Sequence, residues 1–271
     1  MEIVVSSVDP WLETHLERKF GLLERRRRLT HMDISRISED AVLLIGFEQI
    51  LEFTEFGILG DVLSTILDNK RIKKMIAISS YGVYEETGKP FCENEPASPM
   101  NLFGTRALLI ESIANYNARR SKIPLIILRL FNVFGPYQTS PYVVPTILER
   151  IVKKGVITIG DSEKTRDFIY VNDLLDLLSL LIDLDYTGIA VYNVGSGIET
   201  SIHKLIIEAQ EVTGGECDVL FDATKLREEY DYDYAVADIT KIKEELGWEP
   251  KVSLEEGLAL TYQWILGRSG K

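Results

Sequence analysis

Short apolar runs alternate with amphipathic stretches along the first half of the chain, and this alternation limits the possible folds more than any other feature. Apolar runs rich in β-branched residues predict buried strands at 2–6, 41–45, 74–79 and 124–130, with a further strand within 28–34. Apolar residues at helical spacing predict helices over 50–67 and 101–120, and another along Leu12, Leu16, Phe20 and Leu23. Alternating strands and helices of this kind predict an α/β fold, with a parallel sheet covered on both faces.

The second half of the chain is patterned differently. From Gly135 onward, proline and glycine residues are irregularly spaced and the expected elements are shorter, which favours a second, smaller lobe. No internal repeat or low-complexity linker lies in the 271 residues, so we expect two closely joined lobes. The predicted division is a sheet lobe over 1–134, to which 168–195 return, and a C-terminal lobe over 135–167 and 196–271.

The composition excludes several classes of partner. Thirty basic against 42 acidic side chains give a net charge of −12, which argues against nucleic acid or an anionic membrane surface as the main partner. The basic cluster Glu24–Arg28 is interpreted as a solvated helix end in preference to an anion site. Cys92 and Cys217 are far apart and the three histidines are not clustered, so no metal site is expected. Without any run of transmembrane length, we expect a reduced, cytoplasmic protein.

Six segments, in order, carry a more specific signal. They are "ISSYGVYEE", "PFCENEPASPMNLFGTRALLIE", "LRLFNVFGPYQ", "TRDFIYVNDL", "YNVGSGIETSI" and "DITKIKEELGWEPKVSLEEGL". Together they resemble the extended short-chain dehydrogenase/reductase family, and within it the nucleotide-sugar epimerases and dehydratases. The resemblance implies a Rossmann-like, doubly wound sheet with a smaller C-terminal lobe that binds substrate.

The resemblance also implies a chemistry. Members of the family bind NAD or NADP in the sheet lobe and a nucleotide diphosphate sugar between the lobes. A catalytic tyrosine removes a proton from a sugar hydroxyl while hydride passes to the nicotinamide. A lysine one helical turn later lowers the pKa of that tyrosine, because a nearby ammonium favours the phenolate, and a serine or threonine orients the sugar.

The N-terminal loop departs from the family pattern. A gapless overlay places Ser7, Pro10 and Glu13 at the three glycine positions of the phosphate-binding loop. Asp9 is a good helix N-cap and Pro10 a good first helical residue, so this helix is expected to satisfy its own first-turn amide. The carboxylates of Asp9 and Glu13 would also repel a pyrophosphate. From these residues we expect no cofactor.

Two interpretations are open for the acidic residue that holds the adenosine ribose in the family. Asp33 falls at the family distance from Glu13, about 20 residues. However, only seven residues separate Asp33 from Ala41, which leaves no room for a helix. The alternative, which we favour, is that one strand–helix unit of the doubly wound sheet is shortened or deleted.

The catalytic helix departs from the pattern most clearly. Aligned on its proline, asparagine and glycine, the segment places Phe103 at the tyrosine position and Ala107 at the lysine position. These two lie one turn apart on the same helix face, so an apolar pair replaces a proton-transfer pair. The alternatives are a misalignment by one residue, or a substitute acid at Tyr81 or Tyr84. Ser80 is retained at the position of the family serine, although serine also suits a strand end for turn reasons alone.

The C-terminal lobe keeps more of the family residues. The resemblance places five side chains toward a nucleotide sugar: Asn132, Gln138, Arg166, Arg227 and Asp231. An arginine fork at Arg166 suits a diphosphate. The contact at Arg227 is doubtful, because Glu228 could occupy that position instead. Alternatively, the segments that carry these residues serve only the packing of the C-terminal lobe.

Three functions remain open from the sequence. The first is a non-catalytic relative that keeps a nucleotide-sugar site and acts as a regulatory or partner protein, as a homodimer or as a heterodimer with an active homologue. The second is an active NAD-dependent epimerase or dehydratase with altered cofactor binding and a substitute acid. The third is a structural module that pairs through the helices over 50–67 and 101–120, which the family uses for dimerisation.

Overall fold

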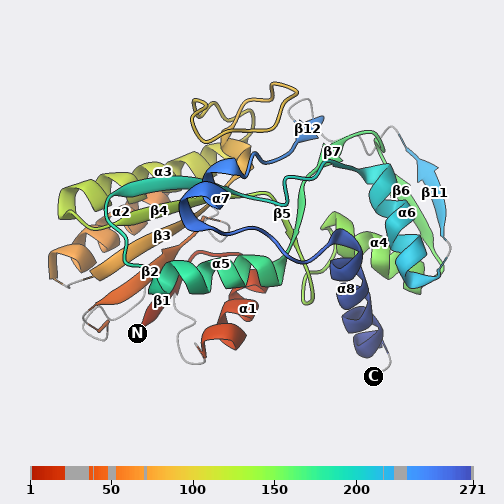
Figure 1. Ribbon diagram of the computed structural model, residues 1–271, viewed down its shortest axis with the longest axis horizontal. Coiled ribbons are helices and arrows are strands. Elements are labelled where there is room, and N and C mark those ends of the chain that lie inside the picture. Colours follow the sequence, from red (N-terminus) through yellow and green to blue (C-terminus); the bar gives the residue numbers. More distant parts are fainter. Residues whose placement is uncertain are drawn as a thin grey trace. The chain divides into compact units, whose positions relative to one another are not determined.

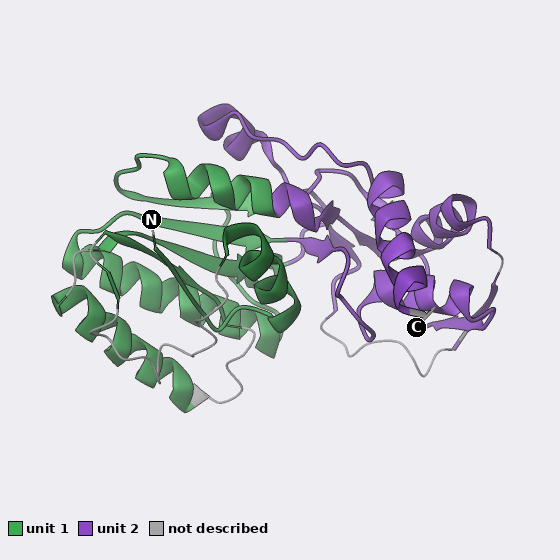
Figure 2. Ribbon diagram, turned by 90° about the horizontal axis from the view of Figure 1, so that it is seen from below, with its two compact units in different colours: residues 1–85, 93–130, 175–193 green, residues 86–92, 131–174, 194–271 purple. Residues whose placement is uncertain are grey.

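The computed structural model describes most of the chain, and Figure 1 gives its elements. The described residues are 2–21, 37–38, 40–47, 53–69, 72–215, 217–222 and 231–269. The predicted strand within 28–34, the basic cluster Glu24–Arg28, Asp33 and Arg227 lie outside them. The chain forms two compact units (Figure 2): unit 1 is 1–85, 93–130 and 175–193, and unit 2 is 86–92, 131–174 and 194–271.

Unit 1 contains the predicted parallel sheet. Its strands, in spatial order, are β1 (Ile3–Ser6), β2 (Ala41–Ile45), β3 (Ile72–Ser80), β4 (Leu125–Leu130) and β9 (Ile189–Val194). The ladders β1–β2, β2–β3 and β3–β4 are all parallel. Every residue of β1, β2 and β4 is buried, as is typical of strands covered on both faces. The α/β, Rossmann-like fold expected from the sequence is thereby confirmed.

Helices cover both faces of this sheet. They are α1 (Pro10–Phe20), α2 (Phe53–Asn69), α3 (Leu102–Ser121) and α5 (Val171–Asp183). Figure 1 shows α2 and α3 along one face and α1 and α5 along the other. An ion pair of 2.9 Å between Lys19 and Asp176 joins α1 to α5. The helices predicted over 50–67 and 101–120 are therefore confirmed, with ends shifted by one to three residues.

In the described part of the chain, β1 forms one edge of the sheet and pairs directly with β2. A complete doubly wound sheet would continue beyond β1. The connection between α1 and β2 falls largely in residues that the structure does not describe. The shortened strand–helix unit therefore stays a prediction.

A lysine is buried inside the sheet. Lys74 on β3 is 1% exposed, and its Nζ donates hydrogen bonds to the carbonyl oxygens of Leu181 and Leu184 at the end of α5. Cations are favoured at a helix C-terminus, where carbonyl groups lack partners within the helix. Burial nevertheless lowers the pKa of Lys74 below its ordinary value. The lysine ties β3 to the last turn of α5.

The described part of unit 2 contains short strands and several helices. Its strand pairs are β5–β8 (Asn132–Phe134, Phe168–Tyr170) and β6–β11 (Val156–Ile159, Asp218–Phe221), and its third sheet is β10–β7–β12 (Thr200–Ser201, Thr165–Arg166, Tyr234–Ala235). The helices are α4 (Val143–Val152), α6 (Ile202–Thr213), α7 (Thr240–Leu246) and α8 (Leu254–Ser269). Residues 131–134 and 168–174 belong to unit 2, whereas the sequence assigned them to the first lobe; β5 and β8 pair with each other, which keeps the two segments together.

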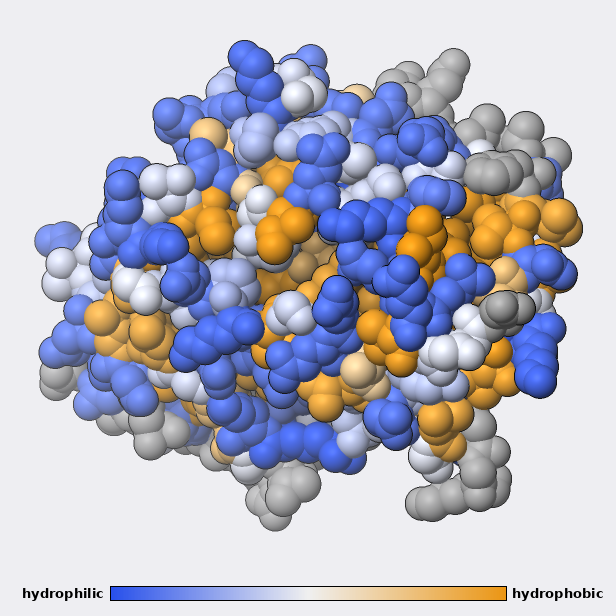
Figure 3. Space-filling view, turned by 45° about the vertical axis from the view of Figure 1, so that its right-hand side comes forward, coloured by the Kyte–Doolittle hydropathy of each residue, from blue (hydrophilic) through white to orange (hydrophobic). Residues whose placement is uncertain are grey.

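The surface is mixed in character. Figure 3 shows hydrophilic residues interspersed with separate apolar patches on the face that it presents. No helix among the described residues is long and apolar enough to cross a membrane.

Candidate functional site

The turn after β1 has the conformation of a tight loop without any glycine. Ser7 has φ +60°, in the left-handed region that glycine usually occupies. The helix then begins as predicted: Asp9 is the N-cap, its Oδ1 accepts the amide of Trp11 at 2.9 Å, and Pro10 is the first helical residue. Ser6 and Ser7 are buried, with their hydroxyl oxygens 3.3 Å apart. The chain therefore makes a left-handed bend at this position with a serine.

Ser80 lies at the carboxyl end of β3 and starts a short turn. Its Oγ accepts the amide of Gly82 at 3.1 Å, which makes Ser80 the N-cap of the 3₁₀ turn η3 (Tyr81–Val83). The side chain is buried. A hydroxyl that accepts one hydrogen bond still carries a proton to donate, so this geometry is compatible with a role toward a ligand.

Helix α3 begins directly against that turn. Asn101 is the N-cap, and its Oδ1 accepts the amide of Gly104 at 2.9 Å. A Cβ on Gly104 would lie 1.8 Å from the carbonyl oxygen of Gly82, so only glycine allows this approach. The contact places Phe103 beside the turn, with its Cδ1 3.3 Å from where a Cβ on Gly82 would be. The first turn of α3 is thus held next to Ser80 by backbone contacts.

The two predicted catalytic positions are apolar in this setting. Phe103 is 50% exposed and stacks at a tilt on Phe47, with ring centroids 5.0 Å apart. Ala107, one turn later, is fully buried. Phenylalanine has no ionisable proton and alanine has no charge, so neither side chain can transfer a proton.

Tyr84, one of the two substitutes considered from the sequence, has another role. It is fully buried, its hydroxyl donates to Oδ1 of Asn193 at 2.8 Å, and the guanidinium of Arg129 lies 4.7 Å from the ring centroid. Burial raises the pKa of Tyr84 to about 12, and the charge of Arg129 only partly offsets this. A general base should titrate near the working pH, so Tyr84 is unsuited to that task.

Helix α3 also contributes to a buried ion pair that was not predicted from the sequence. Glu111, one turn beyond Ala107, accepts two hydrogen bonds from Arg129 on β4, both at 2.9 Å, and one from Ser79 on β3 at 2.6 Å. Burial lowers the pKa of Arg129, but the hydrogen bonds and charge of Glu111 outweigh it and hold the pKa above its ordinary value. The sequence did contain a signal for this pair, because Glu111 is an acid on a helix face that is mainly apolar.

Two of the candidate ligand residues in unit 2 are built into its scaffold. The side-chain amide of Asn132 donates to the carbonyl of Asp167 at 3.1 Å. Gln138 is 3% exposed, and its Nε2 donates to the carbonyl of Val133 at 3.1 Å. Both side chains therefore hold strand β5 and the loop after it, which agrees with the packing alternative.

Arg166 and Asp231, by contrast, form a charged cluster. Arg166 on β7 donates to Asp231 at 3.0 Å, and the Nζ of Lys164 lies 3.4 Å from the same carboxylate. The structure brings together Arg166 and Asp231, which the sequence analysis placed toward a nucleotide sugar, but here they bind each other. The sequence analysis did not include Lys164. The Nζ of Lys164 also lies 3.2 Å from Asp233, so two cations face two carboxylates and the charges of the cluster balance. The guanidinium fork of Arg166 is nevertheless a group that suits a phosphate.

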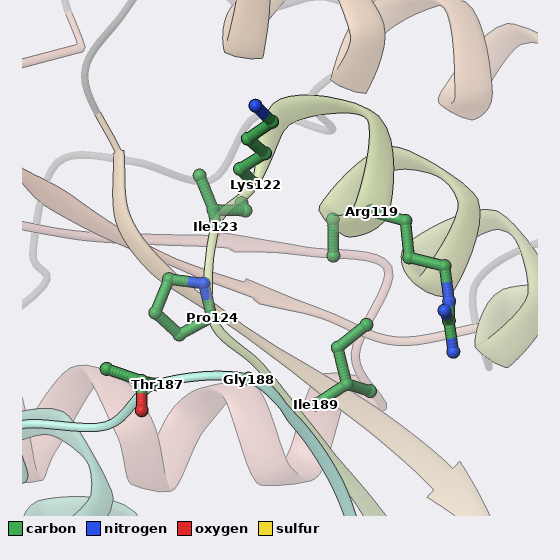
Figure 4. Close-up of a pocket in the computed structure, with 8 residues that line it drawn as sticks. Arg119, Lys122, Ile123, Pro124, Thr187, Gly188 and Ile189 are labelled. Carbon is green, nitrogen blue, oxygen red and sulfur yellow. The ribbon is translucent and has the colours of Figure 1, made fainter.

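The described residues contain no group of His, Cys, Asp and Glu that could hold a metal ion. A hollow of about 270 Å³ in unit 1 lies elsewhere, at the start of β4 (Figure 4). It is lined by Ala118, Arg119, Lys122, Ile123, Pro124, Thr187, Gly188 and Ile189. Since Ser80 pairs with Leu130 at the opposite end of β4, the hollow is at the amino edge of the sheet and separate from the candidate site.

Solved structures share this fold over its whole length. MoeE5 in complex with UDP-glucose and NAD has a TM-score of 0.84 and 21% identity, and the match covers 100% of both chains. UDP-glucuronic acid 4-epimerase from Bacillus cereus, with UDP-glucuronic acid and NAD, has a TM-score of 0.83 and 22% identity, covering 98% of this chain and 91% of the other.

These structures overturn one expectation. The expectation of no cofactor, drawn from Ser7, Pro10 and Glu13 and from the carboxylate of Asp9, is wrong, since solved structures of this fold hold NAD. It treated the one hydrogen bond from the Trp11 amide to Asp9 as if it closed the whole helix end, whereas several first-turn amides of a helix have no partner within the helix.

Curated relatives support the same assignment. The low-salt glycan biosynthesis protein Agl12 of Haloferax volcanii is 32% identical over 209 residues, 75% of this chain and 66% of that protein. The human dTDP-D-glucose 4,6-dehydratase is 28% identical over 243 residues, 87% of this chain and 65% of that protein. The chain thus spans just under two thirds of the length of these relatives.

The family model described as GDP-mannose 4,6 dehydratase matches residues 47–261, so that the match begins after β1 and α1. With this match and the relatives above, the chain belongs to the nucleotide-sugar epimerases and dehydratases of the extended short-chain dehydrogenase/reductase family.

Proposed function

We propose that this chain is a nucleotide-sugar-binding member of its family that does not carry out the family's proton transfer, and that it serves as a regulatory or partner protein. The observation that carries the proposal is the pair Phe103 and Ala107, held beside Ser80 where the family places its tyrosine and lysine. The Asn101 cap and the contact of Gly104 with Gly82 support this register of α3 over one shifted by a residue.

Ligand binding without the tyrosine hydroxyl has a parallel in this fold. A tyrosine-to-phenylalanine variant of the Bacillus cereus UDP-glucuronic acid 4-epimerase was solved with UDP-4-deoxy-4-fluoro-glucuronic acid and NAD. That protein has a TM-score of 0.79 to this chain and 23% identity. In this chain, the guanidinium fork of Arg166 supports binding of the diphosphate of a nucleotide sugar.

For unit 1 we propose NAD as the cofactor, bound more weakly than by a loop with three glycines. The left-handed bend at Ser7 favours a close approach of the pyrophosphate, because it matches the bend of a glycine loop. The carboxylate of Asp9 opposes it, since it already accepts the Trp11 amide and repels a second anion. When bound, NAD would supply a hydride acceptor, while this chain offers no described base at residues 103 and 107.

Association through α2 and α3 is the proposed mode of partnership. Ile58 on α2 is 50% exposed and Tyr116 on α3 is 65% exposed, so each helix presents a large side chain to solvent. Within unit 1 the two helices are joined by a hydrogen bond of 2.8 Å between Ser64 and Asn117. A rigid helix pair with exposed apolar residues suits a second copy of the chain or an active homologue.

Calorimetry and product analysis test the proposal together. The purified chain is titrated with UDP-glucose, dTDP-glucose and GDP-mannose, with and without NAD, and each mixture is then examined for altered sugar by mass spectrometry. We expect binding of at least one nucleotide sugar and no conversion. Conversion that depends on NAD would overturn the proposal in favour of an active enzyme with a substitute acid, and absence of all binding would favour a structural module.

A further inference from the structure

One fully buried carboxylate in unit 2 connects segments that are distant in the sequence. Asp167 is 0% exposed and directly precedes β8. Its Oδ1 accepts the amide and the hydroxyl of Ser196, both at 2.6 Å, and its Oδ2 accepts the amides of Gly197 at 2.9 Å and Ala237 at 3.1 Å. The side chain thereby joins the turn after β9 to the segment after β12.

The space around this carboxylate is completely filled. A Cβ on Gly195 would lie 2.4 Å from Oδ2 of Asp167 and 2.8 Å from Cβ of Ala237. Burial raises the pKa of Asp167 above its ordinary value, while the hydrogen bonds from Ser196, Ala237 and Gly197 act in the opposite direction. The neighbouring backbone is therefore shaped around this one acidic group.

The backbone of Asp167 also carries the candidate ligand residues. Its carbonyl oxygen accepts both the backbone amide of Asn132 at 3.0 Å and the side-chain amide of Asn132 at 3.1 Å. Arg166, the preceding residue, extends its guanidinium to Asp231. A shift of the chain at residue 167 would thus move Asn132 and Arg166 together.

We propose that Asp167 is the positioning residue of unit 2, which sets the Arg166 guanidinium for the diphosphate of a nucleotide sugar. The ligand part of this inference rests on the function proposed above. Asp167 itself touches no ligand in this scheme, because its carboxylate oxygens are fully engaged by Ser196, Gly197 and Ala237. Its effect is exerted through the backbone of its neighbours.

The chain supplies a matched control six residues further on. Asp173 is also buried, at 3% exposed, and its carboxylate also accepts backbone amides, those of Lys251 at 3.0 Å and Val252 at 3.1 Å. Neither acceptor bond involves a candidate ligand residue. Asp167→Asn and Asp173→Asn each replace an acceptor oxygen by a donor that faces other donors, so both should reduce stability.

The experiment compares two readouts for these variants in the full chain. The first is the affinity for UDP, dTDP and GDP by calorimetry. We expect Asp167→Asn to lose tenfold or more and Asp173→Asn to lose less than twofold. The second, independent of any nucleotide, is the NMR signal of the Arg166 guanidinium, which should shift and broaden in Asp167→Asn and stay unchanged in Asp173→Asn.

The outcomes separate this inference from the proposed function. Equal losses of affinity in both variants, or an unperturbed Arg166 signal in Asp167→Asn, would show that Asp167 is a structural residue only. If the wild-type chain binds none of the three nucleotides, the proposed function fails, and the Arg166 signal still decides the positioning. Should Asp167→Asn not fold, Ser196→Ala removes the 2.6 Å hydroxyl bond to Asp167, together with the 3.1 Å bond that this hydroxyl accepts from the Ile198 amide. It should give a smaller shift of the same signal.

Discussion

Two sites of this chain correspond to the places where the family has its chemistry. One is the Ser80 turn with α3 in unit 1, and the other is the Arg166 cluster in unit 2. The two sites keep different parts of the family pattern. In unit 1 the supporting contacts are present, including the Ser80 cap and the Gly104 approach to Gly82, while the reactive positions are apolar. In unit 2 the charged residues are present and paired. Caps and close backbone contacts are needed for folding whether or not a reaction occurs, whereas a tyrosine and a lysine at 103 and 107 are needed only for proton transfer.

The largest effect that separates scaffold from chemistry is expected at the buried ion pair of unit 1. Glu111→Leu leaves the Arg129 guanidinium buried, with 6% exposure, and without its carboxylate, so we expect a loss of about 3–5 kcal/mol in the free energy of unfolding. Urea denaturation measures it. The control is Asp68→Ala, which breaks the exposed pair with Arg120 and should cost at most ~1 kcal/mol. Equal losses would show that burial does not govern the Glu111 pair.

Gly104→Ala should be nearly as damaging. Its Cβ would lie 1.8 Å from the Gly82 carbonyl oxygen, a backbone atom, so α3 must move away from the Ser80 turn at a cost of about 3 kcal/mol. Gly57→Ala in α2 is the matched control, because nothing lies within 4 Å of its Cβ; it should stabilise by about 0.5–1 kcal/mol. Thermal unfolding of both variants gives the comparison. A stable Gly104→Ala protein would contradict the placement of Phe103 beside Ser80.

In unit 2 the corresponding effect should appear in binding. Arg166→Ala removes one partner of Asp231 but leaves Lys164, so we expect a folded protein with nucleotide diphosphate affinity reduced by about 2 kcal/mol, roughly 30-fold. Calorimetry measures it. Arg166→Lys, which keeps the charge but not the fork, should lie between the two proteins. Unchanged affinity in Arg166→Ala would indicate that the cluster only packs the lobe.

Alkaline pH should weaken unit 1 through Tyr84. The unfolded tyrosine ionises near pH 10, whereas the folded pKa is about 12, so stability is complete below pH 10 and falls as the pH rises from 10 to 12. The expected slope from one proton is about 1.4 kcal/mol per pH unit. Tyr84→Phe should make the pH dependence of the unfolding free energy, measured by urea denaturation, shallower by that amount. The same substitution at the exposed Tyr116 provides the baseline, and equal slopes in both variants would refute the assignment.

The smallest expected effect concerns the N-terminal loop. Asn caps helices as well as Asp does, so Asp9→Asn keeps the bond to the Trp11 amide and removes one negative charge. We expect NAD affinity to rise by about 1 kcal/mol, roughly fivefold, measured by calorimetry at low salt. Glu17→Gln, two turns along α1, should change the affinity much less. A decrease in Asp9→Asn would mean that the carboxylate does not oppose the dinucleotide.

Local patterns in the chain were informative about the parts of the site made by one element. The cap at Asp9, the strand that ends at Ser80 and the apolar face of Phe103 and Ala107 could all be predicted, because each depends on residues within a few positions of one another. The inference of no cofactor failed for the opposite reason. It judged cofactor binding from one local cap and two carboxylates, whereas a dinucleotide site is built from several segments of the fold.

By itself the sequence determined the family, the order of the described elements from β1 to β4, and the apolar character of positions 103 and 107, since periodicity and side-chain chemistry are local properties. Only the tertiary structure decided that Arg166 pairs with Asp231, that Glu111 pairs with Arg129, and that Asp167 joins three segments. These partners are separated by 18 to 70 residues, and whether a buried charge is stabilised depends on which distant group the fold brings to it.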